Sequence, residues 1–181
     1  MTALEFLKIA LTDYKVGAVT MSSKYAIQAV LKQLRPGDKV IVEYGAGGGV
    51  VTAKLLEALP SDAKLIAVEI NQDFLKSLRF IKDQRLSVFD QDIVKLCQDF
   101  SGLGIKEADA VLSNVPLTFY DAPTREQVVK HTRDRLKTGG IFIVYQYSPL
   151  MLALLKKYFQ KVTVTLEWRN FPPYFIMVAE K

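Results

Sequence analysis

Three glycines at alternate positions follow a carboxylate in the stretch VIVEYGAGGGVVTAKLLEAL, residues 40–59. Glu43 ends an apolar run, Gly45, Gly47 and Gly49 come next, and a helical pattern follows them. A glycine loop between a strand and a helix exposes the backbone to a ligand, and the free N–H groups of the helix point toward the same place. A carboxylate just before the loop would repel a pyrophosphate and attract a cation. The stretch therefore predicts a site for a ligand with an amino or a sulfonium group.

Carboxylates also follow the next two apolar segments. Glu69 lies near the end of KLIAVEI, where a carboxylate can accept both hydroxyl groups of a ribose, and Asp90 and Asp92 follow at the end of LSVFD, where an adenine amino group would lie. Because ligands bind beyond the carboxyl ends of the strands in parallel sheets, we expect these acids to share one site with the glycine loop. Together they predict a nucleoside with a cationic tail.

Strand-like and helix-like segments alternate along the chain, which predicts an α/β fold with a doubly wound sheet. Strands are expected at 39–44, 64–70, 86–90, 108–114, 141–147, 161–168 and 174–180, and helices at 50–59, 71–81, 124–137 and 149–159. Asn71 is the expected cap of the second helix, and Gly139 and Gly140 are expected to close the third. Only about five residues separate the last two strands, so they must form an antiparallel hairpin. The prediction is a seven-stranded sheet with an antiparallel last strand.

The composition predicts one globular domain inside a cell. The chain has 181 residues and a formal charge of +5, and Cys97 is its one cysteine, which excludes an internal disulfide and fits a reducing cytoplasm. No apolar run approaches the roughly 20 residues that span a bilayer, and no signal peptide is visible. The positive excess lies in residues 1–40 and 151–181. It suits a phosphate-bearing partner, either nucleic acid or anionic lipid, although an ordinary solvated surface explains it equally well.

The motifs VEYGAGGG, AVEIN and FDQD resemble the successive motifs of class I methyltransferases that use S-adenosylmethionine, and the resemblance covers residues 38–181. It implies a Rossmann-like fold, S-adenosylmethionine as cofactor and S-adenosylhomocysteine as product. It assigns the methionine part to Glu43 and the glycine loop, the ribose to Glu69 and the adenine to Asp92. The complete set of implied cofactor contacts is Glu43, Gly45, Ala46, Gly47, Gly49, Glu69, Ile70, Asp90, Gln91, Asp92 and Asn114. His131 reads as a surface residue without a metal cluster around it, so no metal is predicted.

The stretch SNVPLTFYD follows the fourth expected strand and predicts the methyl acceptor site. Pro116 fixes the backbone and can aim a carbonyl into the site, while Asn114 supplies an amide oxygen. Such oxygens can hold an amine with its lone pair toward the methyl donor. The stretch resembles the Asn-x-Pro-aromatic loops of amine methyltransferases, but Leu117 occupies the place of the aromatic that stacks on a flipped adenine. Phe119 or Tyr120 could still stack on an acceptor.

Three further stretches, KVGAVTMSSKYAIQAVL, YQYSPLM and RNFPPYFIMVAEK, resemble bacterial phospholipid N-methyltransferases, which methylate phosphatidylethanolamine. This resemblance implies a lipid amine as acceptor and an anionic membrane surface as partner, with the protein peripheral at the inner membrane face. Tyr147, Tyr120 and the Asn114 side chain are candidates to orient the amine or accept its proton, with solvent as the alternative base. Tyr25 could line the entrance.

Two departures keep an alternative open. Met21 stands where that family usually has a proline, and Asn114 stands where it has a small residue. The asparagine resembles ribosomal-RNA adenine dimethyltransferases, so an RNA adenine-N6 methyltransferase is the second hypothesis. Those enzymes carry an extra helical domain after the last strand, which this sequence lacks, and this favours a lipid. A cofactor-binding module without turnover is the third hypothesis.

The N-terminal segment is predicted to be an amphipathic helix over residues 3–14. It could lie in a membrane interface, or pack on the domain and cover the cofactor. We therefore expect residues 1–37 to form a helical segment that caps the site or faces a membrane, and residues 38–181 to form the methyltransferase domain. Trp168, on an expected strand, is predicted to belong to the core.

Overall fold

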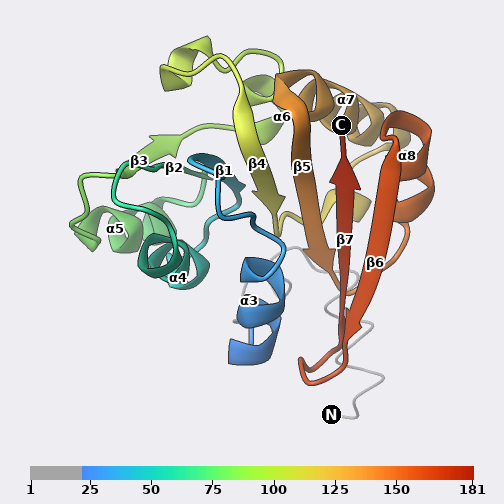
Figure 1. Cartoon of the computed structure of the whole chain (residues 1–181), viewed down its shortest axis with the longest axis horizontal. Helices are drawn as coiled ribbons and strands as arrows, with labels where there is room; N and C mark the ends of the chain where they lie inside the picture. The colour runs from blue at the N-terminus through green and yellow to red at the C-terminus, as the bar shows by residue number, and fades with distance from the viewer. Residues whose placement is uncertain (1–21) are drawn as a thin grey trace.

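The computed structural model describes residues 22–181 and shows one seven-stranded sheet in the order β3-β2-β1-β4-β5-β7-β6 (Figure 1). The helix predicted at 3–14 lies outside the described residues. The strands are β1 Val40–Tyr44, β2 Lys64–Glu69, β3 Leu86–Asp90, β4 Ala108–Ser113, β5 Leu136–Gln146, β6 Lys161–Glu167 and β7 Tyr174–Glu180. Each expected strand is present, so the predicted α/β sheet is confirmed.

The strand directions decide where the loops meet. β1 to β5 pair in parallel, and β7 runs antiparallel to both β5 and β6. This confirms the antiparallel last strand. It also makes β6 parallel to β5, so the turn between β6 and β7 lies at the edge where β1 to β5 end. We call this the carboxyl edge; it lies at the bottom of Figure 1.

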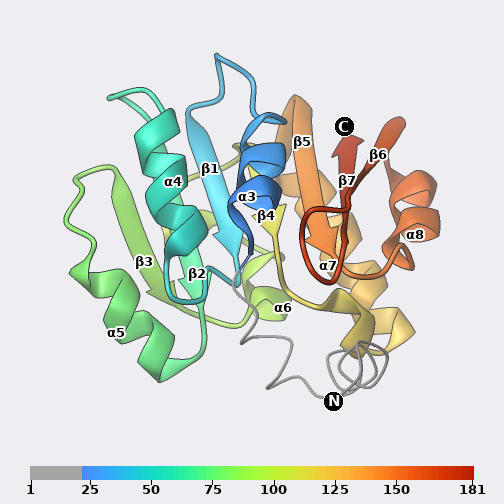
Figure 2. The same ribbon diagram turned by 90° about the horizontal axis from the view of Figure 1, so that it is seen from below.

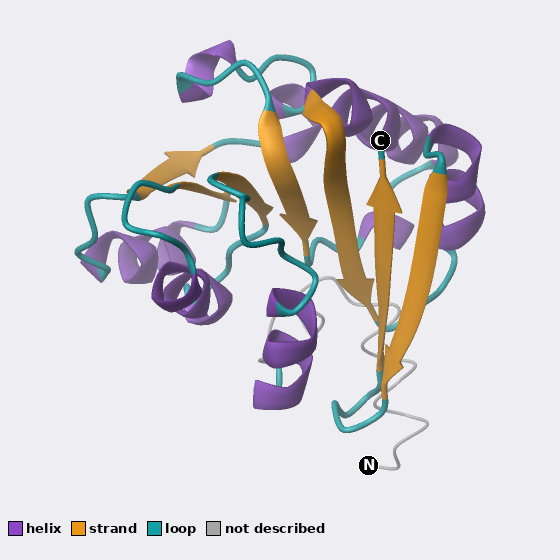
Figure 3. Cartoon of the chain, viewed as in Figure 1, coloured by secondary structure: helices purple, strands orange, loops and turns teal. Residues whose placement is uncertain are grey.

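Helices cover both faces of the sheet (Figures 2 and 3). One face carries α3 Lys24–Leu31, α4 Val50–Ala58 and α5 Gln72–Phe80, and the other carries α6 Ile93–Leu96, α7 Ala122–Arg135 and α8 Met151–Tyr158. The apolar side of each helix packs on the alternating side chains of the buried strands, which gives one core layer per face. Cys97 is fully buried in the layer beneath α6 to α8.

The local signals at the helix ends are partly confirmed. The side chain of Asn71 accepts hydrogen bonds from the N–H groups of Asp73 and Phe74 at 3.0 and 3.2 Å, as predicted for a cap. The prediction that Gly139 and Gly140 close a helix is wrong. The helix ends at Arg135, and β5 passes through the glycines with a bulge against β4. A Cβ on Gly140 would lie 2.9 Å from the carbonyl oxygen of Lys137, so close backbone approach requires glycine there.

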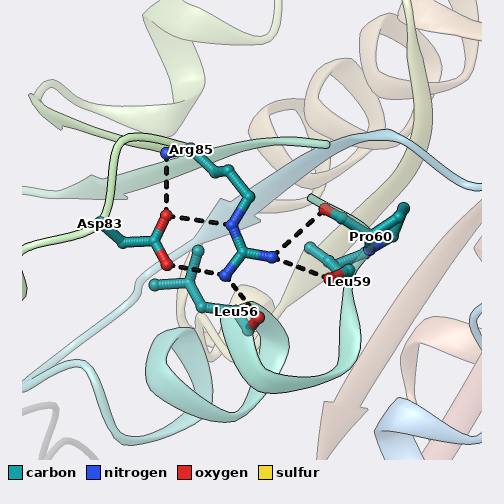
Figure 4. Close-up of polar contacts among 5 residues, drawn as sticks. All are labelled: Leu56, Leu59, Pro60, Asp83 and Arg85. Carbon is teal, nitrogen blue, oxygen red and sulfur yellow. Dashed lines mark hydrogen bonds and ion pairs between the residues drawn. The ribbon is translucent and has the colours of Figure 1, made fainter. Parts of the chain in front are cut away.

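A guanidinium group fastens the end of α4 at the opposite edge of the sheet (Figure 4). Arg85 donates to the carbonyl oxygens of Leu56 and Leu59 at 2.7 and 2.8 Å and of Pro60 at 3.2 Å. It also forms a two-pronged ion pair with Asp83, at 3.0 and 2.7 Å, which lowers the pKa of that carboxyl to about 2. The last carbonyl oxygens of α4, which have no N–H partner within the helix, thereby gain a charged hydrogen-bond donor.

Replacement of Arg85 by alanine should lower the melting temperature by several degrees, because the end of α4 and Asp83 lose their shared partner. The ion pair contributes at neutral pH and is lost as the pH falls through about 2, the lowered pKa of Asp83. Thermal unfolding followed by circular dichroism measures the effect. Arg79→Ala, at an exposed position near the end of α5, is the control and should leave the melting temperature nearly unchanged. Equal shifts in both variants would contradict the assignment.

Candidate functional site

The glycine loop joins β1 to α4 at the carboxyl edge, and two of its glycines are required by the packing of the protein itself. Gly45 and Gly49 have φ angles of 70° and 88°, which favour glycine. A Cβ on Gly45 would lie 2.6 Å from the Cγ2 atom of Val115, and one on Gly49 would lie 2.8 Å from the Cδ1 atom of Ile81. A Cβ on Gly47 would meet nothing within 4 Å. The same holds for Gly48, so the open backbone that the sequence predicted lies at Gly47, whose φ is 54°, and Gly48.

The carboxylate of Glu69 connects this loop to the end of β2. Its Oε2 atom accepts the N–H of Gly47 at 2.8 Å, and its Oε1 atom accepts the N–H groups of Ile70 and Asn71, both at 2.9 Å. Since each carboxylate oxygen has two acceptor positions, Oε2 keeps one for a ligand hydroxyl. As it stands, the side chain can take one ribose hydroxyl rather than the two that the sequence suggested.

The carboxyl group of Glu43 is buried on the α4 side of β1, with 1% of its residue surface exposed. Burial raises its pKa to about 8; the hydroxyl of Thr52, which donates to Oε2 at 2.6 Å, opposes the shift, and the charge of Glu69 adds to it. The carboxyl is therefore mostly protonated at neutral pH and gains most from a cationic partner. Sequence reasoning missed Thr52, for which the only available signal was a polar residue in the first turn of the following helix.

The residues after β3 have local partners of their own. Asp92 caps α6, and its Oδ1 atom accepts the N–H of Val94 at 2.8 Å. Asp90 accepts a hydrogen bond from the side chain of Gln72 at 2.8 Å, and Gln91 is exposed. At the end of the neighbouring strand, the side chain of Ile70 is 47% exposed and offers an apolar surface to a flat base.

Asn114 directly follows β4, next to three tyrosines that project on the α3 side of the sheet. Tyr174 contacts Tyr147, with ring centroids 4.6 Å apart and a hydrogen bond of 3.4 Å from the Tyr174 hydroxyl to the Tyr147 hydroxyl. The ring of Tyr145 packs edge-on against Tyr174 at 6.1 Å. Burial raises the pKa of Tyr174, and the neighbouring Asn114 side chain opposes the shift. We call Tyr145, Tyr147 and Tyr174 the tyrosine cluster.

The structure thus brings together two predicted residues, Asn114 and Tyr147, through one that sequence reasoning missed. Tyr174 is the first residue of β7, directly after the RNFPP turn. Tyr174 lies near the end of β5 because β5 and β7 pair in antiparallel directions. The sequence predicted that the last strand is antiparallel but not that it pairs with β5, so the aromatic residue at its start was the one available signal.

Other predicted acceptor residues lie differently from expectation. Leu117 is fully buried in the core layer beneath α6 to α8, so it offers no surface to an acceptor. The carbonyl of Pro116 accepts the N–H of Phe119 at 2.9 Å within the loop, rather than pointing free into a site. Phe119 is 38% exposed, and Tyr120 packs partly buried against the core. Tyr25, on α3, lies under the guanidinium of Arg169, 4.5 Å from the ring centroid.

This sheet, with its glycine loop and spaced acids, defines a class I S-adenosylmethionine-dependent methyltransferase. Residues 41–140 match the family described as "Methyltransferase domain", and the chain belongs to that family. Its cofactor is S-adenosylmethionine. The buried carboxyl of Glu43 and the open backbone at Gly47 fit a ligand with a cationic amino acid tail.

Two relatives differ in the acceptor that their names state. The chain is 28% identical to an ornithine lipid N-methyltransferase of Singulisphaera acidiphila over 138 residues, which cover 75% of this chain and 72% of that protein. It is 30% identical to the ribosomal RNA small subunit methyltransferase C of Shewanella loihica over 143 residues, which cover 74% of this chain but 39% of that protein.

Solved structures agree on the fold. The precorrin-6y C5,15-methyltransferase of Geobacter metallireducens superposes with a TM-score of 0.68 at 18% identity, over 89% of this chain and 91% of that one. The 1,6-didemethyltoxoflavin-N1-methyltransferase of Burkholderia thailandensis, solved with bound S-adenosylhomocysteine, has a TM-score of 0.68 at 16% identity, over 100% of this chain and 91% of that one. In residues 22–181, no helix is long and apolar enough to cross a bilayer, and no cluster of potential ligands could hold a metal ion.

Glu43→Gln should remove the pH dependence of S-adenosylmethionine binding. In the wild type, the affinity for the cofactor should rise from pH 6 to about pH 8, the raised pKa of Glu43. Binding at neutral pH should release a proton from Glu43, because a cationic partner favours its carboxylate form. Calorimetry in buffers of different ionisation enthalpy measures that proton. The amide keeps an acceptor for Thr52 but cannot ionise. Glu57→Gln, on the exposed side of α4, is the control and should behave as the wild type.

Stability gives a second measurement of the same group. Because the folded-state pKa of Glu43 is raised, the folded protein binds more protons than the unfolded chain between pH 4.5 and about 8, so stability falls as the pH rises through this window. Glu43→Gln should therefore melt at a higher temperature than the wild type, with a gain that grows from pH 4.5 to 8. A gain independent of pH would show that the carboxyl does not titrate there.

Proposed function

We propose that the enzyme transfers the methyl group to the amine of a membrane lipid head group, with phosphatidylethanolamine as the acceptor. The observation that carries the proposal is the tyrosine cluster beside Asn114, on the same face of the sheet as Glu43. The name of the ornithine lipid relative supports it, because that name states N-methylation of a lipid and the similarity covers 75% of this chain.

The cofactor side of the proposal assigns one contact to each strand end. Glu43 and the loop at Gly47 hold the amino acid tail, Glu69 accepts a ribose hydroxyl through Oε2, and Ile70 with Asp92 contacts the adenine. The hydrogen bonds of Glu69 and the cap at Asp92 support these roles, because they hold both carboxylates in place before a ligand arrives. The bound cofactor supplies a methyl group on a cationic sulfur.

The acceptor side depends on aromatic faces and neutral oxygens. Tyrosine rings attract an ammonium group, and the Tyr147 hydroxyl and the Asn114 amide oxygen can accept its N–H groups. The buried Tyr174 stays protonated, because burial raises its pKa above the ordinary value near 10. Tyr174 therefore positions Tyr147 and Asn114 instead of acting as a base, and the amine loses its proton to water before attack.

A second candidate is methylation of an adenine in RNA. The similarity to a ribosomal RNA enzyme and the exposed ring of Phe119 favour it. That relative is matched over 39% of its length, so most of it has no counterpart in the aligned region. RNA binding through phosphates would weaken steeply with salt, which separates the two candidates experimentally.

Incubation with cofactor labelled in its methyl group should label phosphatidylethanolamine in mixed vesicles with phosphatidylglycerol. Thin-layer chromatography of the extracted lipid measures the product. Vesicles of phosphatidylcholine and phosphatidylglycerol are the control, because their head groups have no free amine and should stay unlabelled. Vesicles with ornithine lipid and a ribosomal RNA fraction are run in parallel. Label in RNA alone would overturn the proposal in favour of the second candidate.

Tyr147→Phe and Tyr174→Phe should each lower kcat by about tenfold, the effect of losing one hydrogen bond that orients the acceptor. Affinity for the cofactor should not change, since neither hydroxyl belongs to its proposed contacts. Tyr158→Phe is the matched control, because that hydroxyl bonds to Glu126 away from the carboxyl edge. An unchanged kcat in both cluster variants would remove the cluster from the acceptor site.

A further inference from the structure

Exposed apolar side chains gather at the carboxyl edge of the sheet. Within residues 22–181, those at or next to this edge are Val50, Ile70, Phe119, Leu150, Leu166, Trp168 and Phe171. Among the other exposed large apolar side chains of this region, Phe80 is the last residue of α5 and Val164 lies midway along β6. Most of the exposed large apolar side chains therefore lie at the edge that holds the cofactor loop.

The most exposed members lie where the chain turns from β6 to β7. Trp168 and Phe171 expose 73% and 71% of their surface, although the sequence predicted Trp168 in the core, which is wrong. Leu166, at the end of β6, and Leu150, between β5 and α8, are 50% and 67% exposed. We call these four residues the hairpin surface. Figure 1 shows the turn between β6 and β7 projecting below the sheet.

The turn that carries these side chains is held by buried polar contacts. Asn170 is 3% exposed; its Oδ1 atom accepts the N–H of Ser23 at 2.9 Å, and its Nδ2 atom donates to the carbonyl of Pro172 at 2.6 Å. Arg169 forms two bonds with the carboxylate of Glu167, at 2.8 and 2.7 Å. The polar side chains of the turn therefore have hydrogen-bond partners within the protein, and the aromatic side chains are exposed to solvent.

Lys24 gives the surroundings of the hairpin surface a net positive charge, because Arg169 and Glu167 neutralise each other. Lys24, at the start of α3, and Arg169 both lie over the Tyr25 ring. Glu167 is the carboxylate of this turn, and it is 5% exposed and paired with Arg169. An apolar surface with a cationic rim complements an anionic lipid head-group layer.

We propose that the hairpin surface inserts into the head-group region of an anionic membrane and docks the carboxyl edge on it. The inference rests on the proposed function, since it explains how a lipid amine reaches the site without leaving the bilayer. Tryptophan suits this place because its apolar ring and polar N–H favour the boundary between hydrocarbon and water. The turn leads directly into the tyrosine cluster, because Tyr174 is the first residue of β7.

Trp168 is the one tryptophan of the chain, so its fluorescence reports on this surface directly. In buffer, its emission should be that of a water-exposed indole. With vesicles of phosphatidylcholine and phosphatidylglycerol, it should shift to shorter wavelength and be quenched by lipids brominated on their acyl chains. Vesicles of phosphatidylcholine alone should give a smaller shift, and added salt should reduce the effect.

Phe171→Ser and Leu150→Ser should each weaken vesicle binding by about tenfold, because an apolar side chain no longer leaves water. Both variants keep Trp168 as reporter. Phe80→Ser is the matched control, since it removes an aromatic side chain that is 80% exposed at the end of α5, outside the hairpin surface, and it should bind as the wild type does.

Three results would overturn the inference. One is sedimentation with anionic vesicles without any change in Trp168 emission, which would assign binding to another surface, including residues 1–21. Another is Trp168 emission at short wavelength already in buffer, which would mean that a second copy of the chain or residues 1–21 cover the hairpin surface. The third is the absence of binding to either vesicle.

Methyl transfer to phosphatidylethanolamine dispersed in detergent micelles separates the two proposals. Transfer in micelles without insertion of Trp168 into vesicles would reject the docking surface and leave the proposed function standing. Insertion without transfer to any lipid amine would reject the function and support the surface.

Discussion

The hydrogen bonds of the Glu69 carboxylate hold the cofactor site together. They join the backbone of the glycine loop to the end of β2, two segments 22 residues apart in sequence. A carboxylate that accepts N–H groups from both sides fixes its own position and that of the loop. The open backbone at Gly47 and the remaining acceptor position of Oε2 face the same place because of this contact.

The second constraint is the point at which the strand order reverses. β1 and β4 are neighbours, so the loops after them meet, and Gly45 leaves room for the side chain of Val115. Ligands in doubly wound sheets bind at such a point. Here it separates an acidic half, with the ends of β2 and β3, from an aromatic half, with the ends of β5 and β6 and the start of β7. A methyl donor in the first half and an amine in the second would meet beside Asn114.

Burial determines the chemistry of the groups on the α3 and α4 side. Glu43 has its pKa raised because water is excluded around it, and burial raises the pKa of Tyr145 and Tyr174 as well. A cationic ligand next to Glu43 would stabilise its carboxylate form, which burial disfavours. The tyrosines stay neutral, so their hydroxyl groups can form hydrogen bonds and their rings can attract a cation. The exposed aromatic residues of the β6–β7 turn continue this half outward to the surface.

Local patterns in the sequence determined the strands, the glycine loop, the order of the acids and the cap at Asn71, because periodicity, turn residues and capping act over a few neighbouring residues. Tertiary structure alone decided that Leu117 is buried and Trp168 exposed, since an apolar residue faces inward only where another element covers it. It also decided that Tyr174 joins Tyr147, that β5 runs through Gly139, and that burial raises the pKa of Glu43. Each of these depends on residues far apart in the chain, whose proximity no local pattern contains.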